Sequence, residues 1–370
     1  MIEDLNKTIV EKFPEVETLD DWRECKLDEL GSLQRGRSRH RPRYAFHLYG
    51  GNYPFIQTGE IRTARKYIRE YEQTYNQAGL EQSKLWPKNT LCITIAANIA
   101  ELAILSFDAC FPDSVLGFIA DQSKADLNFI YYTLTHFQRE LKHIGEGSVQ
   151  DNINLGTFQN LLFPIPPLAE QKTIAAILSS LDDKIDLLHR QNQTLEAMAE
   201  TLFRQWFVVE AQENWETGKL ADEFEFTMGQ SPSGNSFNEV GIGVPMFQGN
   251  ADFGFRFPSE RVFTTEPTRF ARKFDTLISV RAPVGAQNMA DKECCIGRGV
   301  AAFRYKRDNS FYTYTYFKLR STMDDIKQFN DEGTVFGSIG KSDFETLVIV
   351  IPHFEAIARF ETAAKPINDK

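Results

Sequence analysis

Cysteine is scarce in this chain of 370 residues, and the five cysteines form no recognisable pattern. They include no Cys-x-x-Cys pair and their number is odd, which argues against a disulfide framework or a zinc cluster and for a reducing compartment. Long apolar runs are also missing: no stretch of 18 apolar residues could span a membrane. The polar N-terminus does not resemble a secretory signal. We therefore expect a cytoplasmic protein with no metal site and no membrane segment.

A basic balance is lacking as well, because the formal net charge is −10. Proteins that bind DNA alone usually carry a basic balance. The basic residues are clustered, however. Five arginines alternate with other residues from Arg35 to Arg43, and four more basic residues follow from Arg62 to Arg69. This clustering makes residues 35–69 the first candidate for contact with DNA phosphates.

Catalytic motifs are missing too. The chain contains no Asp/Asn-Pro-Pro-Tyr sequence of an adenine methyltransferase and no glycine-rich loop for S-adenosylmethionine after a predicted strand. Residues Phe336 to Ser342 resemble the end of a P-loop, but Val335 stands where that motif requires its first glycine. We expect no catalytic residue and no cofactor in this chain.

An internal repeat is the strongest positive feature. Residues 145–167 match residues 331–353, which lie 186 positions later, and both segments end in an apolar run followed by Ile-Pro. Three earlier matches extend the repeat; they are Trp22 with Trp215, Tyr53–Gln57 with Val244–Gln248, and Asn89–Ile93 with Phe274–Ile278. The segments between the matches diverge. The sequence therefore predicts an α+β chain with two similar α/β units that share a scaffold and present different faces, which suits two unlike target segments.

A long helix is predicted over residues 168–211, which contain neither glycine nor proline. Apolar residues recur there with alternating spacings of four and three, as in a coiled-coil seam. A helix of this length is a rod of roughly 60 Å. The predicted helix-packing residues are Ile174, Leu178, Leu181, Ile185, Leu188, Asn192, Leu195 and Leu202. Asn192 either fixes the register of the seam or points outward at its edge.

The second copy is expected to begin a similar helix at residues 353–370. Pro366 should break or kink this helix, because proline lacks the backbone N–H and clashes with the preceding turn. The second helix is therefore expected to be short, and much of the first seam would lack a counterpart. Either the chain is truncated, or another polypeptide packs against the exposed stripe.

A resemblance to a known family rests on the junction between the first copy and the long helix. The residues that carry it are Gly147, Ser148, Ile153, Ile165, Pro166, Pro167, Leu168, Glu170 and Gln171. This pattern closely resembles the end of a target-recognition domain and the start of the central conserved helix in specificity subunits of type I restriction–modification enzymes. Two departures stand out. His353 to Ile357 follow the second Ile-Pro in place of Pro-Leu-x-Glu-Gln, and the last helix is short.

The resemblance implies an organisation and a set of partners. An N-terminal segment (1–18) would precede the first target-recognition domain (19–167), the central conserved helix (168–211), the second domain (212–352) and the start of the distal conserved helix (353–370). Each domain would read one half of a split double-stranded DNA site, and the helices would form an antiparallel pair that separates the halves. The chain would dock two methyltransferase subunits, which bind S-adenosylmethionine and methylate adenine, and ATP-dependent restriction subunits that use Mg²⁺ would join the full complex.

Candidate DNA-contacting residues are polar or basic residues in predicted loops. In the first copy they are Arg35, Arg37, Ser38, Arg39, Arg41, Gln57, Thr58, Arg62, Arg65, Lys66, Ser148 and Gln150. In the second copy they are Gln230, Ser231, Ser233, Gln248, Asn250, Arg281, Arg298 and Ser338. Arg62, Arg65 and Lys66 are predicted to contact phosphates.

Three other interpretations remain open from the sequence. The chain could serve a different effector, such as a fused type IIB-like methylase–nuclease. It could be a non-catalytic coiled-coil scaffold with two protein-binding heads, although the arginine cluster argues against this. It could also be a truncated, inactive specificity subunit.

Overall fold

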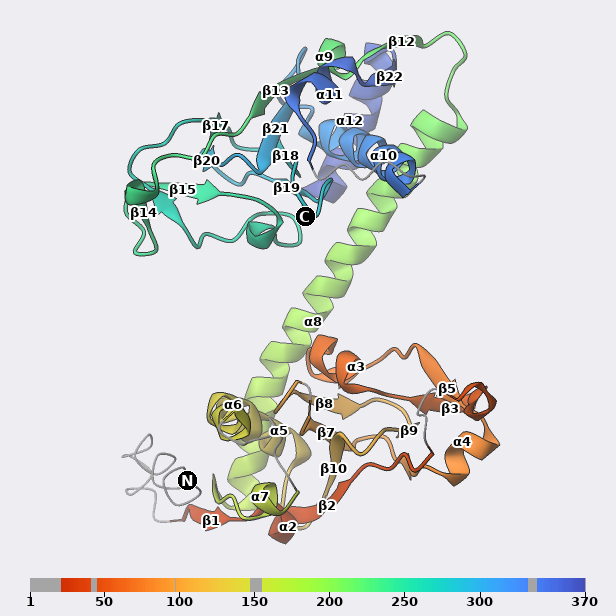
Figure 1. The fold of residues 1–370 in the computed structure, drawn as a ribbon, viewed down its shortest axis with the longest axis vertical. Helices are drawn as coiled ribbons and strands as arrows, with labels where there is room; N and C mark the ends of the chain where they lie inside the picture. Colours follow the sequence, from red (N-terminus) through yellow and green to blue (C-terminus); the bar gives the residue numbers. More distant parts are fainter. Residues whose placement is uncertain (1–20, 41–44, 97, 147–154, 332–337, 370) are drawn as a thin grey trace. The chain divides into compact units, whose positions relative to one another are not determined.

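A computed structural model describes residues 21–40, 45–96, 98–146, 155–331 and 338–369 of the chain. The chain divides into two compact units, Met1–Leu187 and Leu188–Lys370, drawn in Figure 1. The boundary falls inside one long helix, α8 (Leu168–Arg204), which therefore contributes to both units. None of the described helices is long and apolar enough to cross a membrane.

The main sheet of unit 1 has five strands in the order β2-β10-β7-β8-β4. The strands are β2 (Gly31–Arg35), β4 (Tyr67–Ile68), β7 (Leu91–Thr94), β8 (Leu102–Leu105) and β10 (Val115–Ala120). Neighbours are antiparallel except β4 and β8, which are parallel. Every residue of β7 and β8 is buried because both faces of this sheet are covered, which explains their continuous apolar sequences.

Helices cover one face of the main sheet (Figure 1). They are α5 (Leu127–His136), α6 (Gln138–Glu146) and α7 (Leu155–Gln159). Leu91 and Ile93 of β7 point into the same core cluster as Phe129 and Leu134 of α5. The Asp126 carboxylate caps α5 by accepting the Phe129 N–H at 3.0 Å. Cys92 points to the opposite face, where a second cluster forms beneath α3 (Thr58–Thr63).

A smaller sheet of unit 1 carries the polar loops discussed below. Its order is β5-β3-β9-β6, with β3 (Tyr49–Phe55), β5 (Gln73–Tyr75), β6 (Leu85–Trp86) and β9 (Ala109–Cys110). It is flanked by the 3₁₀ turn η2 (Phe46–Leu48) and by α4 (Gln77–Glu81). A separate antiparallel pair, β1 (Arg23–Cys25) with β11 (Phe163–Ile165), and the short helix α2 (Leu27–Leu30) complete the unit.

Unit 2 repeats this arrangement. Its main sheet has the order β13-β21-β18-β19, formed by β13 (Phe224–Met228), β18 (Thr276–Ser279), β19 (Gln287–Met289) and β21 (Val300–Tyr305). The smaller sheet has the order β14-β16-β15-β20-β17, formed by β14 (Phe237–Asn238), β15 (Val244–Phe247), β16 (Phe263–Thr264), β17 (Phe270–Ala271) and β20 (Cys294–Ile296). The remaining elements are β12 (Glu216–Lys219), α9 (Leu220–Glu223), η4 (Gly234–Ser236), η5 (Asn250–Asp252), α10 (Tyr312–Asp331), α11 (Lys341–Thr346) and β22 (Val348–Ile351).

The predicted repeat is confirmed at the level of single hydrogen bonds. Asn89 and Phe274 both have positive φ, 65° and 69°. The N–H of Asn89 donates to Leu105 O at the end of β8 at 2.9 Å, and that of Phe274 donates to Ala290 O, directly after β19, at 2.7 Å. The N–H groups of Lys26 and Lys219 each donate to an acidic side chain three residues later. Two sequences with few identical residues therefore build the same main-chain frame.

The motif at the start of α8 holds this helix to unit 1. The buried Gln171 side chain donates to the carbonyls of Pro166 and Lys124 and accepts the Asp126 N–H. Glu170 accepts the indole N–H of Trp22 at 3.1 Å. In unit 2 the corresponding position is Ala356, and the buried indole N–H of the equivalent tryptophan finds no acceptor among the described residues. The departure from the family motif thus leaves one polar group unsatisfied.

The helix of the second copy, α12 (Phe354–Asn368), continues through Pro366. The expected break at this proline is wrong. Pro366 lies in the last turn, on the exposed side, where water can solvate the carbonyl that loses its N–H partner. Phe360 of α12 packs edge-on against Phe203 of α8, with ring centroids 5.6 Å apart. After Arg204, a π-helical turn (η3, Gln205–Val209) ends the long helix, earlier than the predicted limit at residue 211.

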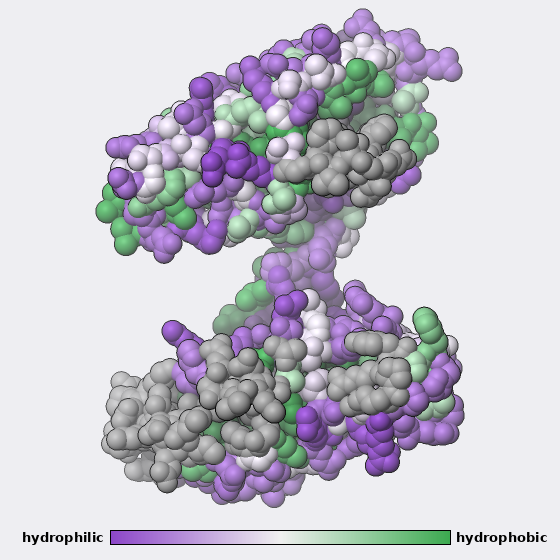
Figure 2. All heavy atoms as spheres, in the orientation of Figure 1, coloured by the Kyte–Doolittle hydropathy of each residue, from purple (hydrophilic) through white to green (hydrophobic). Residues whose placement is uncertain are grey.

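The predicted seam of α8 is only partly covered. Ala199 and Phe203 are buried in the core of unit 2, and Ile174 packs against the core of unit 1. Between them, Leu181 and Ile185 are 58% and 48% exposed. Leu188 is exposed as well. The expectation that these three residues pack against a helix is therefore not met by the described part of the chain, and α8 presents hydrophobic side chains at its surface (Figure 2).

Candidate nucleic-acid interface

The loop after the first strand of each main sheet has the same geometry in both units. In unit 1 the N–H groups of Gly36 and Arg37 donate to the carbonyls of Val115 and Phe111. In unit 2 the N–H groups of Gly229 and Gln230 donate to the carbonyls of Val300 and Ile296. This match makes Gln230 the structural counterpart of Arg37. The arginine-rich loop of unit 1 and the loop at 229–234 of unit 2 are therefore equivalent.

Glycine is required at the start of this loop in both units. A Cβ atom on Gly36 would lie 2.2 Å from the Pro112 carbonyl oxygen, and one on Gly229 would lie 2.1 Å from the Gly297 carbonyl oxygen. Since real contacts are never that short, only glycine lets the chain approach the neighbouring strand so closely. The loop that follows is therefore placed by the backbone, whatever its side chains are.

A second loop follows the parallel strand of each smaller sheet. In unit 1, Phe55 of β3 pairs in parallel with Cys110 of β9, and Gln57 lies two residues later. In unit 2, Met246 of β15 pairs in parallel with Cys295 of β20, and Gln248 lies two residues later. The two glutamines occupy equivalent places, as the sequence match predicts. Gln57 is partly engaged, because its amide donates to Gln73 at 3.2 Å.

These loops of unit 2 enclose a polar recess with a volume of about 130 Å³. Five of the predicted residues converge on it from four separate segments of the chain. The recess is lined by Ser231, Gln248, Gly249, Asn250, Ser279, Arg281, Ala282, Arg298 and Gly299. We call this site the unit 2 recess. The sequence patterns did not single out Ser279, which donates to the carbonyls of Arg281 and Pro283 and so shapes one wall.

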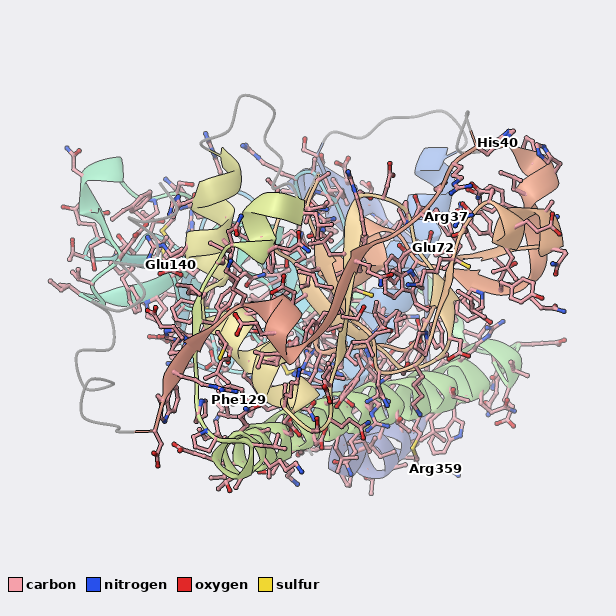
Figure 3. All side chains as sticks on the ribbon, turned by 90° about the horizontal axis from the view of Figure 1, so that it is seen from below. Arg37, His40, Glu72, Phe129, Glu140 and Arg359 are labelled. Atoms are coloured by element: carbon pink, nitrogen blue, oxygen red, sulfur yellow. The ribbon has the colours of Figure 1, made fainter. Side chains whose placement is uncertain are left out.

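The basic loop of unit 1 is held by its main chain, which leaves several side chains at the surface. Ser83 Oγ donates to Arg37 O, and Arg39 N–H donates to Gln82 O at 3.3 Å. Arg35 and Arg39 are exposed, and Arg37 is half-buried. The Arg37 guanidinium donates at 3.5 Å to Glu81 O. Figure 3 shows Arg37 and His40 near one another at one end of unit 1.

Two of the predicted residues do not reach the surface. Ser38 is 5% exposed, so its side chain does not reach a DNA groove. Lys66 is also 5% exposed. The Lys66 ammonium donates to Tyr132 Oη and Ser179 Oγ, both at 2.9 Å. The prediction that Lys66 contacts a phosphate is wrong, because this amine binds α5 and α8 instead. Burial of the ammonium lowers the pKa of Lys66.

The other predicted residues are distributed as follows. Thr58 is half-buried at the start of α3, while Arg62 and Arg65 are exposed. Gln230 and Ser233 are exposed on the loop of unit 2, and Ser338 forms an antiparallel bridge with Arg281. Arg41, Ser148 and Gln150 lie outside the described residues. Most candidates therefore lie on or beside the two equivalent loops.

Several cysteine thiols are unsuited to nucleophilic chemistry. All five cysteines are buried and unpaired. Burial raises the pKa of Cys110 to about 11 and that of Cys294 to about 12. Thiols with such a pKa are protonated at neutral pH and react poorly. The described residues contain no cluster of three or more His, Cys, Asp or Glu able to hold a metal ion.

Comparison with known proteins shows which family has this fold. A family model described as the type I restriction modification DNA specificity domain matches residues 19–197 and again residues 212–360. The putative type I restriction enzyme MjaX specificity subunit of Methanocaldococcus jannaschii is 33% identical over 268 residues, which are 67% of this chain and 63% of that protein. The matched stretch thus covers less than two thirds of that relative.

Two further relatives match nearly the whole chain. The type I restriction enzyme MjaIX specificity subunit of the same archaeon is 21% identical, covering 99% of this chain and 90% of that protein. The crystal structure of a type I restriction–modification S subunit from M. genitalium shares the fold with a TM-score of 0.63 at 17% identity, over 94% of this chain and 90% of that one. Since the family model matches both halves, the chain belongs to the type I restriction modification DNA specificity family, with two copies of its domain.

Proposed function

We propose that this chain is the DNA-reading specificity subunit of a type I restriction–modification enzyme. Each unit reads one half of a split double-stranded target, and the two halves differ in sequence. The observation that carries the proposal is the pair of equivalent loops, which have the same main-chain bonds and unlike side chains.

The difference between the loops supports unlike half-sites. The first loop of unit 1 presents Arg37 and Arg39, whereas that of unit 2 presents Gln230, Ser231 and Ser233. Arginine, glutamine and serine side chains are suited to phosphates and base edges. If both loops met the same sequence, as in a symmetric reader, the same side chains would be expected in both.

We assign catalysis to partner subunits. The sequence holds no adenine-methyltransferase motif, so two methyltransferase subunits that bind S-adenosylmethionine would supply methylation. Restriction subunits that use ATP and Mg²⁺ would join the full complex, and the complex would work in the cytoplasm. The exposed apolar residues Ile177, Leu181 and Ile185 on α8 support docking of a partner helix, because an unpaired seam gains stability when it is covered.

The first experiment identifies the target. Methylation-sensitive long-read sequencing would compare host genomes with and without the gene for this chain. We expect a split motif with modified adenine in each half that disappears on deletion. No change in any motif would refute the assignment and favour an inactive subunit or a protein scaffold.

The second experiment tests the basic loop. The double variant Arg37→Ala/Arg39→Ala should bind the target more weakly, and the slope of log affinity against log salt should fall by about 1 for each phosphate that the variant no longer neutralises. The exposed Arg23 on β1 provides a matched control, Arg23→Ala, which should change neither quantity. An unchanged affinity of the double variant across a salt titration would contradict the role of this loop.

A further inference from the structure

We propose that the unit 2 recess reads a guanine in the half-site that unit 2 contacts, with Arg281 and Arg298 as the specificity-determining residues. This inference rests on the proposed function, since it names the base that one unit of a DNA reader selects. It goes further in assigning one base to one set of side chains.

The chemistry of the lining selects an acceptor-rich group. Arg281 and Arg298 bring two guanidinium groups, Gln248 and Asn250 bring amides, and Ser231 brings a hydroxyl. None of the lining residues is acidic, and neither guanidinium forms an ion pair with a described residue. The nearby Asp252 is already engaged, because it accepts the Gln248 N–H at 2.7 Å and a bond from Arg261. The recess therefore offers positive charge and donors to a group with several acceptor atoms.

The backbone places the two arginines although they are far apart in sequence. Val280 N–H donates to Gly299 O at 2.9 Å. Arg281 follows Val280 and Arg298 precedes Gly299, so this bond brings both arginines to the same end of the sheet. Arg298 N–H also donates to Ser231 Oγ at 3.3 Å. A Cβ atom on Gly299 would lie 2.1 Å from Gln248 O, so the wall that carries Gln248 packs directly on this turn. The main chain that carries the donors is thus held by hydrogen bonds and close packing, which reduces the backbone entropy lost on binding.

Comparison with unit 1 separates a base contact from a phosphate contact. Ile95 N–H donates to Ser114 O at 2.9 Å, the same bond that Val280 makes with Gly299. The position of Arg281 is therefore occupied by Ala96 in unit 1, and that of Arg298 by Asp113. A phosphate contact carries no sequence information, whereas a residue that reads a base has to differ where the two half-sites differ. The change from arginine in unit 2 to alanine or aspartate in unit 1 is the difference expected of a residue that reads a base.

Guanine is the base whose exposed edge fits these donors. In the major groove it presents two acceptors, N7 and O6, and paired donation from one arginine is the commonest specific contact to a base. Thymine and adenine each offer one acceptor there, and cytosine offers a donor. Unit 1, with Asp113 at the equivalent place, is not expected to read guanine by this route.

The test uses the full chain purified with its methyltransferase subunits and duplexes that carry the genomic target. Affinities would be measured for the wild type, Arg281→Ala and Arg298→Ala against duplexes in which each base pair of the second half-site is replaced in turn. For one G·C pair, we expect replacement to weaken wild-type binding by roughly 5- to 150-fold. The two variants should lose affinity for the native duplex and no longer distinguish that pair.

An atomic probe makes the test sharper. Replacing the same guanine by 7-deazaguanine removes its N7 acceptor and leaves pairing and O6 intact, so wild-type binding should weaken, but by less than in the contacting arginine variant, which loses both bonds. In that variant, 7-deazaguanine should cause no further loss of affinity. Arg307→Ala is the matched control, because Arg307 is exposed beyond the other end of β21, roughly 20 Å from Arg298 at ~3.3 Å per strand residue.

Three outcomes would overturn the inference, and they differ from failure of the proposed function. A uniform loss for all duplexes with a smaller salt slope would assign the arginines to phosphates. Discrimination that shifts to an A·T pair would assign the recess to another base. Unchanged binding by both variants would remove it from the interface. If the wild type binds no sequence selectively, the proposed function itself fails.

Discussion

Replacing Lys66 by methionine separates a structural role of this residue from a role in DNA binding. Lys66, directly before β4, is joined to α5 and α8 by bonds of 2.9 Å to Tyr132 Oη and Ser179 Oγ. Tyr132 in turn donates to Asp182 at 2.6 Å. Methionine keeps the length of the side chain and removes its charge and donors. The change therefore deletes one polar network while preserving most of the packing.

The magnitude follows from two opposing effects. Each hydrogen bond that involves a charged group is worth about 1.5–3 kcal/mol. The loss of two such bonds is partly offset because the folded state no longer has to bury an ammonium group, which costs several kcal/mol. We expect a net loss of about 2 kcal/mol in the free energy of unfolding of unit 1. For a unit of this size, that lowers the melting temperature by roughly 4–8 °C.

The assay combines thermal unfolding with hydrogen exchange. The melting temperature of the variant should fall, and amides of α5 and the first half of α8 should exchange faster. The control is Arg62→Ala, which alters an exposed cation on the same stretch of chain and should change stability by less than about 0.5 kcal/mol. If Lys66→Met leaves stability unchanged but reduces the salt dependence of DNA binding, the bonds to α5 and α8 are not the role of Lys66.

Two further predictions concern unit 2. Burial raises the pKa of Glu223 from 4.5 to about 7. Because Glu223 ionises at lower pH in the unfolded chain, the free energy of unfolding should fall by roughly 3 kcal/mol as pH rises from about 4.5 to 7. In urea titrations, Glu223→Gln should remove most of this pH dependence, whereas the control Glu225→Gln, at an exposed position, should retain it. Ala356→Glu should supply the acceptor that the Trp215 indole N–H lacks and stabilise unit 2 by about 1 kcal/mol. The gain in stability should disappear in a Trp215→Phe background; if it persists there, another contact is responsible.

The repeat could be predicted from sequence because its matched residues serve the frame. The tryptophans and the Ile-Pro pairs lie in or directly beside the strand pairs β1–β11 and β12–β22. Such requirements leave the same residue types in both copies. The matches were therefore enough to predict two units of one fold and the long helix between the matched segments.

Lys66 shows what spacing alone could not provide. It follows Arg62 and Arg65 in a basic run, which suggested one shared role. The structure ends α3 at Thr63, and the chain bends at Arg65 and Lys66 before β4, which leaves Arg65 exposed and Lys66 buried. A lysine that contacts phosphate and one that bonds to a distant helix have the same local pattern.

The recess was predictable as a set of residues but not as a site. Gln248, Arg281 and Arg298 were each chosen for polarity in a turn, and nothing in their separation along the chain indicates that they meet. They are brought together by main-chain bonds between residues of ordinary apolar or glycine type. Pairing between distant strands is the information that a single sequence lacks.

The main-chain bonds at Gly36 and Gly229 have an evolutionary consequence. Because backbone atoms and glycines place the loops, the side chains that follow can change without loss of fold. Mutations of these side chains can therefore change what the loop binds without the loss of folding stability that usually accompanies a new function. Under the function proposed above, a lineage carrying this chain would acquire new DNA targets by substitution at a few exposed sites, and the two units would change independently of each other.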